Sequence, residues 1–177
     1  MQLKSLKYFS KGKRSKVYTA LYKNKKVIVK YSNRSLIEAK WLKKLKKLKF
    51  IPKLISSDKN TLVMEFIEGK TINDYIKKTK NPKLILKQIL KQCYELDKLE
   101  INKLELTNPY KHILIKNKKA KMIDFERCYK TENPKNVTQF TEFLMRKRLI
   151  DRKITPLLKN YKKNKTKTNF SKILSSF

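Results

Sequence analysis

Apolar and polar residues alternate along the first third of the chain, a pattern that predicts short β-strands separated by polar turns. Strands are expected at residues 6–10, 16–22, 26–31, 53–56 and 61–67. Between the third and fourth of these the period becomes helical, because apolar residues recur every three or four positions from Ser35 to Leu48. Ile51-Pro52 ends this helix. The first third therefore predicts a five-stranded sheet with one helix.

The remainder of the chain is mainly helical in pattern. A short helix is expected to begin at Thr71 and a longer one at Pro82, because proline is favoured in the first turn of a helix. Two short strands at 113–115 and 120–125 interrupt the helical pattern, which returns from Asn136 onward.

Together these elements predict an α+β fold of two lobes, with a ligand-binding cleft between them. We assign residues 1–67 to a five-stranded first lobe and residues 68–158 to a short, mainly helical second lobe. Residues 159–177 form a basic C-terminal tail, and the low complexity of 159–167 is typical of partial disorder.

The charge of the chain is strongly unbalanced. Of 177 residues, 47 are Lys or Arg and 14 are Asp or Glu, which gives a formal net charge of +33. Such a surface attracts polyanions, so RNA or the ribosome is an expected partner. The alternative is a lysine-rich composition without a dedicated site, because the excess is mostly Lys and is spread along the chain. Since acids are rare, an acid at a strand end indicates function more strongly than a lysine does.

Cysteine usage and apolar runs exclude several classes of protein. Cys93 and Cys128 have neither the spacing of a zinc site nor that of a disulfide framework. No apolar run has the length of a signal peptide core or of a membrane span. We therefore expect a cytoplasmic protein with reduced thiols and no membrane partner.

Four segments resemble the protein kinase fold, and the resemblance covers roughly residues 6–150. In chain order they are Val27–Lys30, the helix segment that carries Glu38, Thr61–Gly69 and Lys121–Glu126. They are similar to the small archaeal kinases, such as the RIO kinases and the kinase of the KEOPS complex, and to archaeal kinases with an Ile-Asp-Phe-Glu-Arg ending. The resemblance implies a bilobal protein-kinase-like fold that uses ATP with Mg²⁺ or Mn²⁺.

The resemblance assigns roles to three charged residues. Lys30 would contact the α- and β-phosphates of ATP, and Glu38 would pair with it and orient it. Asp124 would hold the metal ion, for which a carboxylate is a suitable hard ligand. For Glu38 a second interpretation stays open, because Ser35 and Glu38 have the spacing of a helix capping box.

Further residues would bind the nucleotide. Met64 matches the gatekeeper position, and the backbone groups of Glu65 and Ile67 would bind the adenine edge. The turn before the second strand would cradle the phosphates, although it fits an ordinary basic β-turn almost as well. The turn residues assigned to the nucleotide are Gly12, Lys13 and Ser15.

The predicted catalytic loop departs from the usual kinase pattern. With a two-residue insertion, Glu105 reaches the position of the catalytic base and could accept the proton of a hydroxyl. His112 takes the place of the metal-binding asparagine, and an imidazole suits Mn²⁺ better than Mg²⁺. The alternative for His112 is a histidine packed at the start of a strand.

These patterns favour an atypical serine/threonine kinase that transfers the γ-phosphoryl group of ATP to a protein hydroxyl. The altered loop favours an alternative, a pseudokinase that serves as a basic binding module for RNA, the ribosome or a protein complex. A third possibility is a small-molecule phosphotransferase similar to aminoglycoside kinases, for which the short second lobe leaves little room.

Overall fold

The computed structural model describes residues 2–12 and 15–177. The chain divides into two compact units, the first made of Met1–Gly69 with Lys121–Glu126 and the second of Lys70–Ala120 with Arg127–Phe177. The sequence assignment of residues 1–67 to one lobe omitted the returning segment 121–126. That segment belongs to the first unit because the Met122 amide donates to the Phe50 carbonyl at 2.7 Å.

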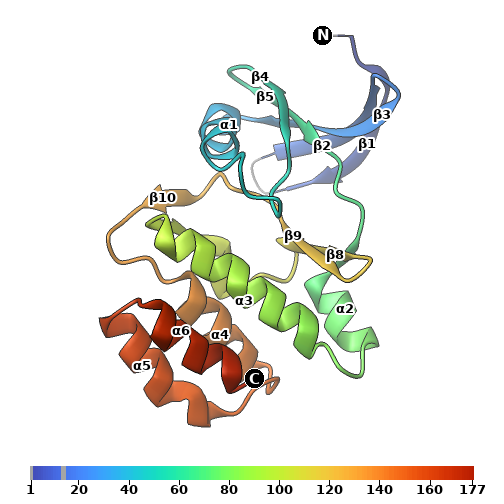
Figure 1. Ribbon diagram of the computed structural model, residues 1–177. Helices are drawn as coiled ribbons and strands as arrows, with labels where there is room; N and C mark the ends of the chain where they lie inside the picture. Colours follow the sequence, from blue (N-terminus) through green and yellow to red (C-terminus); the bar gives the residue numbers. More distant parts are fainter. Residues whose placement is uncertain (1, 13–14) are drawn as a thin grey trace. The chain divides into compact units, whose positions relative to one another are not determined.

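The first unit is a five-stranded antiparallel sheet with one helix (Figure 1). Its elements are β1 (Lys4–Lys11), β2 (Ser15–Tyr22), β3 (Lys25–Ser32), α1 (Ser35–Lys44), β4 (Leu54–Ser57) and β5 (Thr61–Glu65). The strand order is β1-β2-β3-β5-β4, so β3 lies at the centre of the sheet. The predicted five strands and single helix are confirmed.

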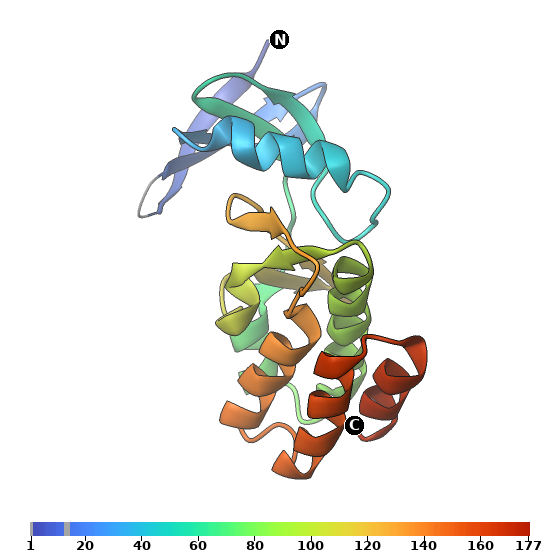
Figure 2. The ribbon, with the colours of Figure 1, turned by 90° about the vertical axis from the view of Figure 1, so that its left-hand side faces the viewer.

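The central strand β3 is buried on both of its faces. Val27 and Val29 of β3 are buried in a cluster with Ala20 and Val63, while Ile28 and Lys30 on the opposite face of the strand are buried as well. Helix α1 packs against β3, β4 and β5 and covers one face of the sheet (Figure 2). A strand that is buried on both faces holds its side chains in fixed positions.

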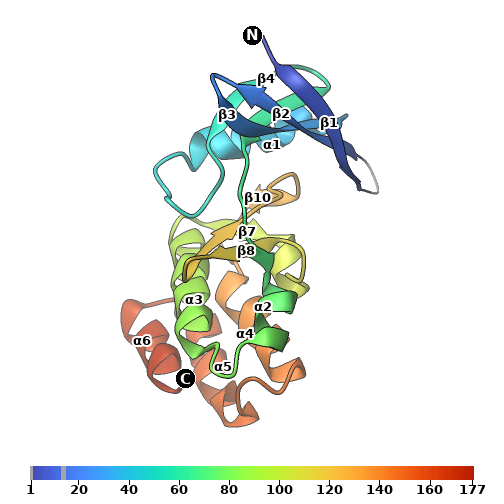
Figure 3. The same ribbon diagram turned by 90° about the vertical axis from the view of Figure 1, so that its right-hand side faces the viewer.

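The second unit is mainly helical. Its elements are β6 (Lys70–Thr71), α2 (Ile72–Lys78), α3 (Lys83–Lys98), β7 (Ile101–Lys103), η1 (Leu104–Thr107), β8 (Ile113–Lys116), β9 (Lys119–Met122), β10 (Cys128–Lys130), α4 (Asn136–Arg146), η2 (Arg152–Ile154), α5 (Thr155–Lys163) and α6 (Lys167–Ser175). Strand β9 runs from the second unit into the segment 121–126 of the first. The strands form the small sheets β6-β8-β9 and β7-β10, and α3 packs against α4 and α6 (Figure 3).

Two strand predictions differ from the structure. The strand expected at 120–125 is β9 and ends at Met122, because Asp124 has a backbone φ of 64° that an extended strand cannot contain. Strands β7 and β10 were not expected, since each has only three residues and forms through antiparallel pairing with the other.

The C-terminal segment also differs from the expectation of a partly disordered tail. Residues 159–177 complete α5 and contain α6, and Tyr161, Phe170 and Ile173 are buried. The ring of Phe170 stacks on Tyr94 of α3, with 4.2 Å between the ring centroids. Buried apolar residues at helical spacing therefore anchor a segment whose lysines dominate its composition.

Both cysteines, Cys93 and Cys128, are buried. Along the described part of the chain, every helix is too short or too polar to cross a bilayer.

Candidate active site

Three carboxylates surround one ammonium group in the first unit. Lys30 Nζ, on the central strand β3, lies 2.7 Å from Glu38 Oε2, 3.2 Å from Asp124 Oδ1 and 3.2 Å from Glu126 Oε2. Lys30 is only 7% exposed. The structure thus brings together three residues predicted from the sequence, Lys30, Glu38 and Asp124, and adds Glu126.

Glu38 links the sheet to the segment that follows β9. Its Oε2 accepts the hydrogen bond from Lys30, and its Oε1 accepts one from the Phe125 amide at 3.0 Å. The capping-box interpretation of Ser35 and Glu38 is wrong, because the N-cap of α1 is Arg34 and has no side-chain cap. The Ser35 hydroxyl instead donates to the Ser32 carbonyl.

The carboxylates keep Lys30 charged. Burial alone would lower the pKa of the ammonium group, but attraction by Glu38, and then by Asp124 and Glu126, raises this pKa above its ordinary value. With the three carboxylates ionised, the four side chains carry a formal charge of −2. A divalent cation would balance that charge.

The oxygen atoms of this cluster fit a hard metal ion. Ligand oxygens of Glu38, Asp124 and Glu126 all lie within 4.8 Å of one another, and oxygens around Mg²⁺ at about 2.1 Å must lie about 3–4 Å apart. Glu38 is already held by Lys30 and Phe125. Asp124, whose side chain is 30% exposed, and Glu126 are therefore the residues best placed to hold Mg²⁺ or Mn²⁺.

Asp124 occupies an unusual backbone conformation. Its φ of 64° lies in the left-handed region, where Asp and Asn are tolerated better than most residues. Such a conformation costs about 1–3 kcal/mol and is concentrated at functional sites. The turn at Asp124 ends the strand and presents its carboxylate to Lys30.

The predicted adenine-binding residues lie at the end of β5. Met64 is buried, and Glu65 is the last residue of the strand. The Glu65 amide donates to the Lys53 carbonyl at 2.9 Å, so its donor is used within the sheet. Ile67 follows in a segment outside any strand, where its backbone amide can face a ligand; its role stays a prediction.

The predicted phosphate turn is only partly described. Lys13 lies outside the described residues. The Gly12 amide donates to the Ser15 carbonyl at 2.8 Å, and a Cβ at Gly12 would lie 2.9 Å from Ser15 Oγ. This close approach explains the glycine and uses its amide inside the hairpin. Phosphate binding by Gly12 and Ser15 stays a prediction.

In the second unit, Glu105 lies in η1 directly after β7. Its Oε2 is 3.1 Å from Nζ of Lys103, a lysine that is fully buried at 0% exposure. Its Oε1 lies 3.8 Å from Arg127 Nε. Oε1 is buried, and the described residues offer it no hydrogen-bond donor. Glu105 therefore has one oxygen held by a cation and one oxygen that could accept a proton.

A buried polar network fixes the strand that carries Lys103. Asn136, at the start of α4, accepts from the Lys103 amide at 2.8 Å and donates to the Ile101 carbonyl at 2.6 Å. Asn136 also donates to Asp97 of α3, which accepts the Tyr161 hydroxyl of α5 at 2.9 Å. Burial raises the pKa of Asp97 above its ordinary value, although these hydrogen bonds oppose the shift.

Sequence reasoning missed this network. The available signal was the position of Asp97 one helical turn after the buried Cys93, on the apolar side of α3. A carboxylate on an apolar helix face requires partners.

His112 precedes β8, and its amide donates to the Pro109 carbonyl at 2.9 Å. Within residues 2–12 and 15–177, the three side chains that are arranged to hold a metal are Glu38, Asp124 and Glu126. His112 does not belong to that group, and its role as a metal ligand stays a prediction.

Residues 2–147 match the RIO domain. The chain belongs to the RIO domain family. This family consists of atypical protein kinases related to Ser/Thr kinases, so the kinase resemblance drawn from the four segments is confirmed.

A relative of this RIO domain protein is an uncharacterized protein from Methanocaldococcus jannaschii. The two sequences are 35% identical over 77 residues, which is 42% of this chain and 66% of the relative. The matched RIO domain contains Glu105 and the Lys30 cluster, which is Lys30 with the three carboxylates around it. Helices α5 and α6 lie after the end of the match at residue 147.

Proposed function

We propose that this RIO domain protein is an ATP-dependent atypical serine/threonine kinase that phosphorylates a protein hydroxyl in the cytoplasm. The observation that carries the proposal is the buried Lys30 ammonium, held by Glu38 and facing Asp124. Phosphoryl transfer depends mainly on positioning and on stabilising charge. A fixed ammonium beside carboxylates that fit a metal supplies both requirements.

The site residues of the first unit would hold the nucleotide. Lys30 would contact the α- and β-phosphates, and Glu38 keeps it in place. Asp124 would hold Mg²⁺ or Mn²⁺, which neutralises charge on the phosphates when it is bound. The backbone of Glu65 and Ile67 would accept from and donate to the adenine edge, beside Met64.

Glu105 would serve the acceptor hydroxyl. The hydroxyl oxygen attacks the γ-phosphorus, and the bond from that phosphorus to the oxygen bridging the β-phosphate breaks, which leaves ADP. The hydroxyl proton passes to Glu105 Oε1 and from there to solvent. The lack of a donor to Oε1 among the described residues supports this role, and Lys103 holds the other carboxylate oxygen.

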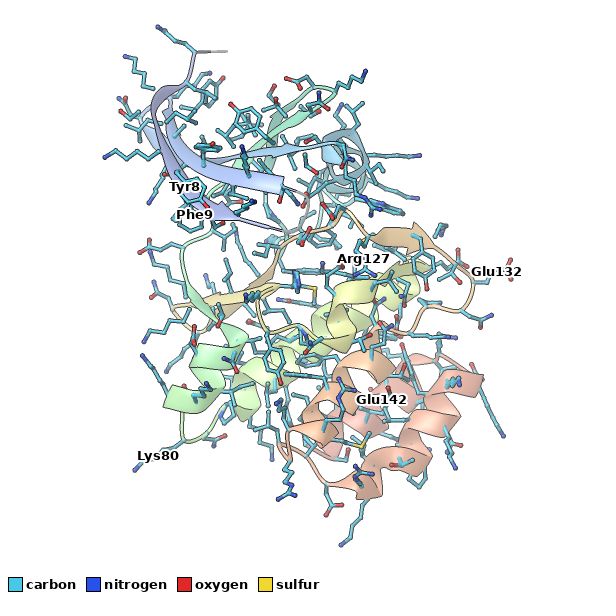
Figure 4. All side chains as sticks on the ribbon, turned by 180° about the vertical axis from the view of Figure 1, so that it is seen from behind. Tyr8, Phe9, Lys80, Arg127, Glu132 and Glu142 are labelled. Atoms are coloured by element: carbon cyan, nitrogen blue, oxygen red, sulfur yellow. The ribbon has the colours of Figure 1, made fainter. Side chains whose placement is uncertain are left out.

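The test is γ-phosphoryl transfer by the full chain, measured with labelled ATP and Mg²⁺ or Mn²⁺. The variants are Lys30→Met, Asp124→Asn and Glu105→Gln, and the matched control is Glu132→Gln, a change at an exposed acid (Figure 4). We expect each variant to lose about a hundredfold or more of the transfer rate, while the control keeps it. Nucleotide binding by titration calorimetry is the second measurement. Absence of both binding and transfer in the wild-type chain would overturn the proposal.

A second candidate function is a pseudokinase that binds RNA, alone or within the ribosome. It is favoured by the basic surface of α5 and α6, which lie beyond the RIO domain match. Their exposed lysines are Lys159, Lys162, Lys163, Lys167 and Lys172. The apolar sides of both helices are buried in the fold, so the exposed sides offer charge for phosphates and lack the apolar face of a membrane-binding helix.

A further inference from the structure

The loop that carries Glu105 is flanked by cationic side chains. Arg127 Nε lies 3.8 Å from Glu105 Oε1, and the Arg127 side chain is 52% exposed. Arg146, at the end of α4, donates to the carbonyl of Thr107, which is the last residue of η1. Lys147 follows, with its ammonium 5.0 Å from the centre of the Tyr110 ring.

The pairing of Arg127 with Glu105 is incomplete. A separation of 3.8 Å is too long for a hydrogen bond, so Glu105 Oε1 has no donor among the described residues. A guanidinium group has five N–H donors in a planar fork that fits carboxylate and phosphate groups. Half of the Arg127 side chain faces solvent, where a bound molecule can reach that fork.

Two kinds of ligand chemistry follow from this arrangement. A buried acceptor without a donor destabilises the fold, and a hydroxyl that displaces the half-exposed Arg127 side chain and donates to Glu105 Oε1 would remove this cost. Exposed Arg146 and Lys147, which contact Thr107 and Tyr110, add positive charge to that of Arg127 along this loop and favour a negatively charged ligand. Because Glu105 is itself an acid, an anionic acceptor could approach it only where cations such as these surround it.

We propose that the acceptor is acidic: a serine or threonine hydroxyl with carboxylate side chains on neighbouring residues of the same protein segment. Glu105 Oε1 receives the hydroxyl, and Arg127, assisted by Arg146 and Lys147, binds the flanking carboxylates. This inference rests on the proposed kinase function and names its substrate class. A basic segment would face repulsion from the same three cations.

The test uses three peptides with one serine each, flanked by Glu, by Gln or by Lys. The full-length protein and Arg127→Ala are compared with Arg152→Ala, which removes an exposed arginine of η2. Lys80→Ala is a second control, because Lys80 lies far from Arg127 in Figure 4. Transfer from ATP and peptide binding by fluorescence anisotropy are both measured at about 0.15 M salt, which screens distant surface charges.

For the wild-type protein we expect the Glu-flanked peptide to be the best substrate and the tightest ligand. Arg127→Ala should lower its kcat/KM and its affinity about tenfold, as for a lost charge-assisted pair, and should reduce the preference for the Glu-flanked over the Gln-flanked peptide by the same factor. Both controls should resemble the wild type. Equal use of the three peptides, or equal losses in Arg127→Ala and Arg152→Ala, would overturn the inference while leaving kinase activity intact.

Peptide binding separates the two proposals. If no peptide is phosphorylated but the Glu-flanked peptide still binds in an Arg127-dependent way, the kinase function fails and the recognition of acidic segments stands. If no peptide binds preferentially and none is phosphorylated, both fail.

Discussion

Lys30 Nζ lies 2.7 Å from Glu38 Oε2, and both side chains are buried. The central strand and the only helix of the described first unit are therefore joined by one ion pair. The other oxygen of Glu38 accepts from the Phe125 amide, which fixes the residue next to Asp124. One carboxylate thus positions both the cation and the acid that the proposed reaction requires.

The first prediction concerns Glu38→Gln. Lys30 and the Phe125 amide donate to different oxygens of Glu38, and a glutamine would place an NH2 donor at one of these two positions. We expect phosphoryl transfer to fall about a hundredfold, the usual effect of a displacement near 1 Å in an active site. The control is Glu95→Gln, which breaks the exposed pair of Glu95 with Lys98. Transfer that is equal in both variants would contradict a positioning role for Glu38.

The second prediction concerns stability at alkaline pH. Because the folded-state pKa of Lys30 lies above its ordinary value of 10.5, the charged group stabilises the fold fully below about pH 10.5. This contribution is lost as the pH rises through the folded-state pKa. Lys30→Met leaves three carboxylates without their cation, and at neutral pH we expect the free energy of unfolding to fall by about 3–5 kcal/mol.

This difference between wild type and Lys30→Met should shrink above pH 10.5, as measured by urea unfolding at several pH values. Lys43→Met, at an exposed position of α1, is the control and should show a small difference at every pH. A gap that stays constant or widens with rising pH would show that the carboxylates do not raise the Lys30 pKa.

The third prediction concerns Glu126→Gln. The change reduces the formal charge of the Lys30 cluster from −2 to −1 and removes one hard oxygen ligand. We expect the affinity for Mn²⁺, measured by electron paramagnetic resonance without nucleotide, to fall about tenfold. Glu142→Gln, at an exposed acid of α4, should bind Mn²⁺ as the wild type does. An unchanged affinity in Glu126→Gln would mean that Glu126 pairs with Lys30 but does not bind the metal ion.

The fourth prediction concerns Tyr161→Phe. The buried Asp97 carboxylate would lose the hydroxyl donor at 2.9 Å, which should lower the free energy of unfolding by about 1–3 kcal/mol. Tyr129→Phe, at an exposed tyrosine of β10, should have little effect. Thermal and denaturant unfolding measure both variants. Equal stability of the two variants would mean that Asp97 is satisfied without Tyr161.

The fifth prediction concerns RNA binding by α5 and α6. Wild-type affinity for duplex RNA should fall with salt, with a log–log slope of about 0.9 for each phosphate contacted. Replacing both Lys159 and Lys163 with alanine should reduce this slope by about two contacts. The control replaces two exposed lysines of α1, Lys43 and Lys44. A slope that is equally reduced in both double variants would indicate a general surface charge without a dedicated site.

The sequence predicts those parts of the fold that depend on nearby residues. The five strands of the first unit follow from alternation of apolar residues, and Lys30, Glu38 and Asp124 follow from short motifs at strand and helix ends. Glu126 did not stand out as a partner of Lys30, because its position only showed a departure from the usual glycine. Its contact with Lys30, 96 residues away, depends on how the segment after β9 returns to the first unit.

The second unit is harder to predict because its polar contacts join distant elements. Lys103 and Asn136 are 33 residues apart, and Asp97 and Asn136 are 39 apart. No local pattern encodes such pairs. The basic C-terminal helices show a second limitation, because four lysines between 159 and 165 mask the buried Tyr161 that anchors α5 to Asp97.

The hydrogen bond from Tyr161 to Asp97 also determines when, during synthesis, the second unit can finish folding. Its partners are separated by 64 residues, so during synthesis on the ribosome Asp97 emerges long before the group that completes its hydrogen bonds. The strand that carries Lys103, and with it Glu105, therefore cannot have its full support until residue 161 has been made. A nascent chain stalled before that point would present Glu105 on an unfinished scaffold, so the synthesis of α5 would be required before the second unit is complete.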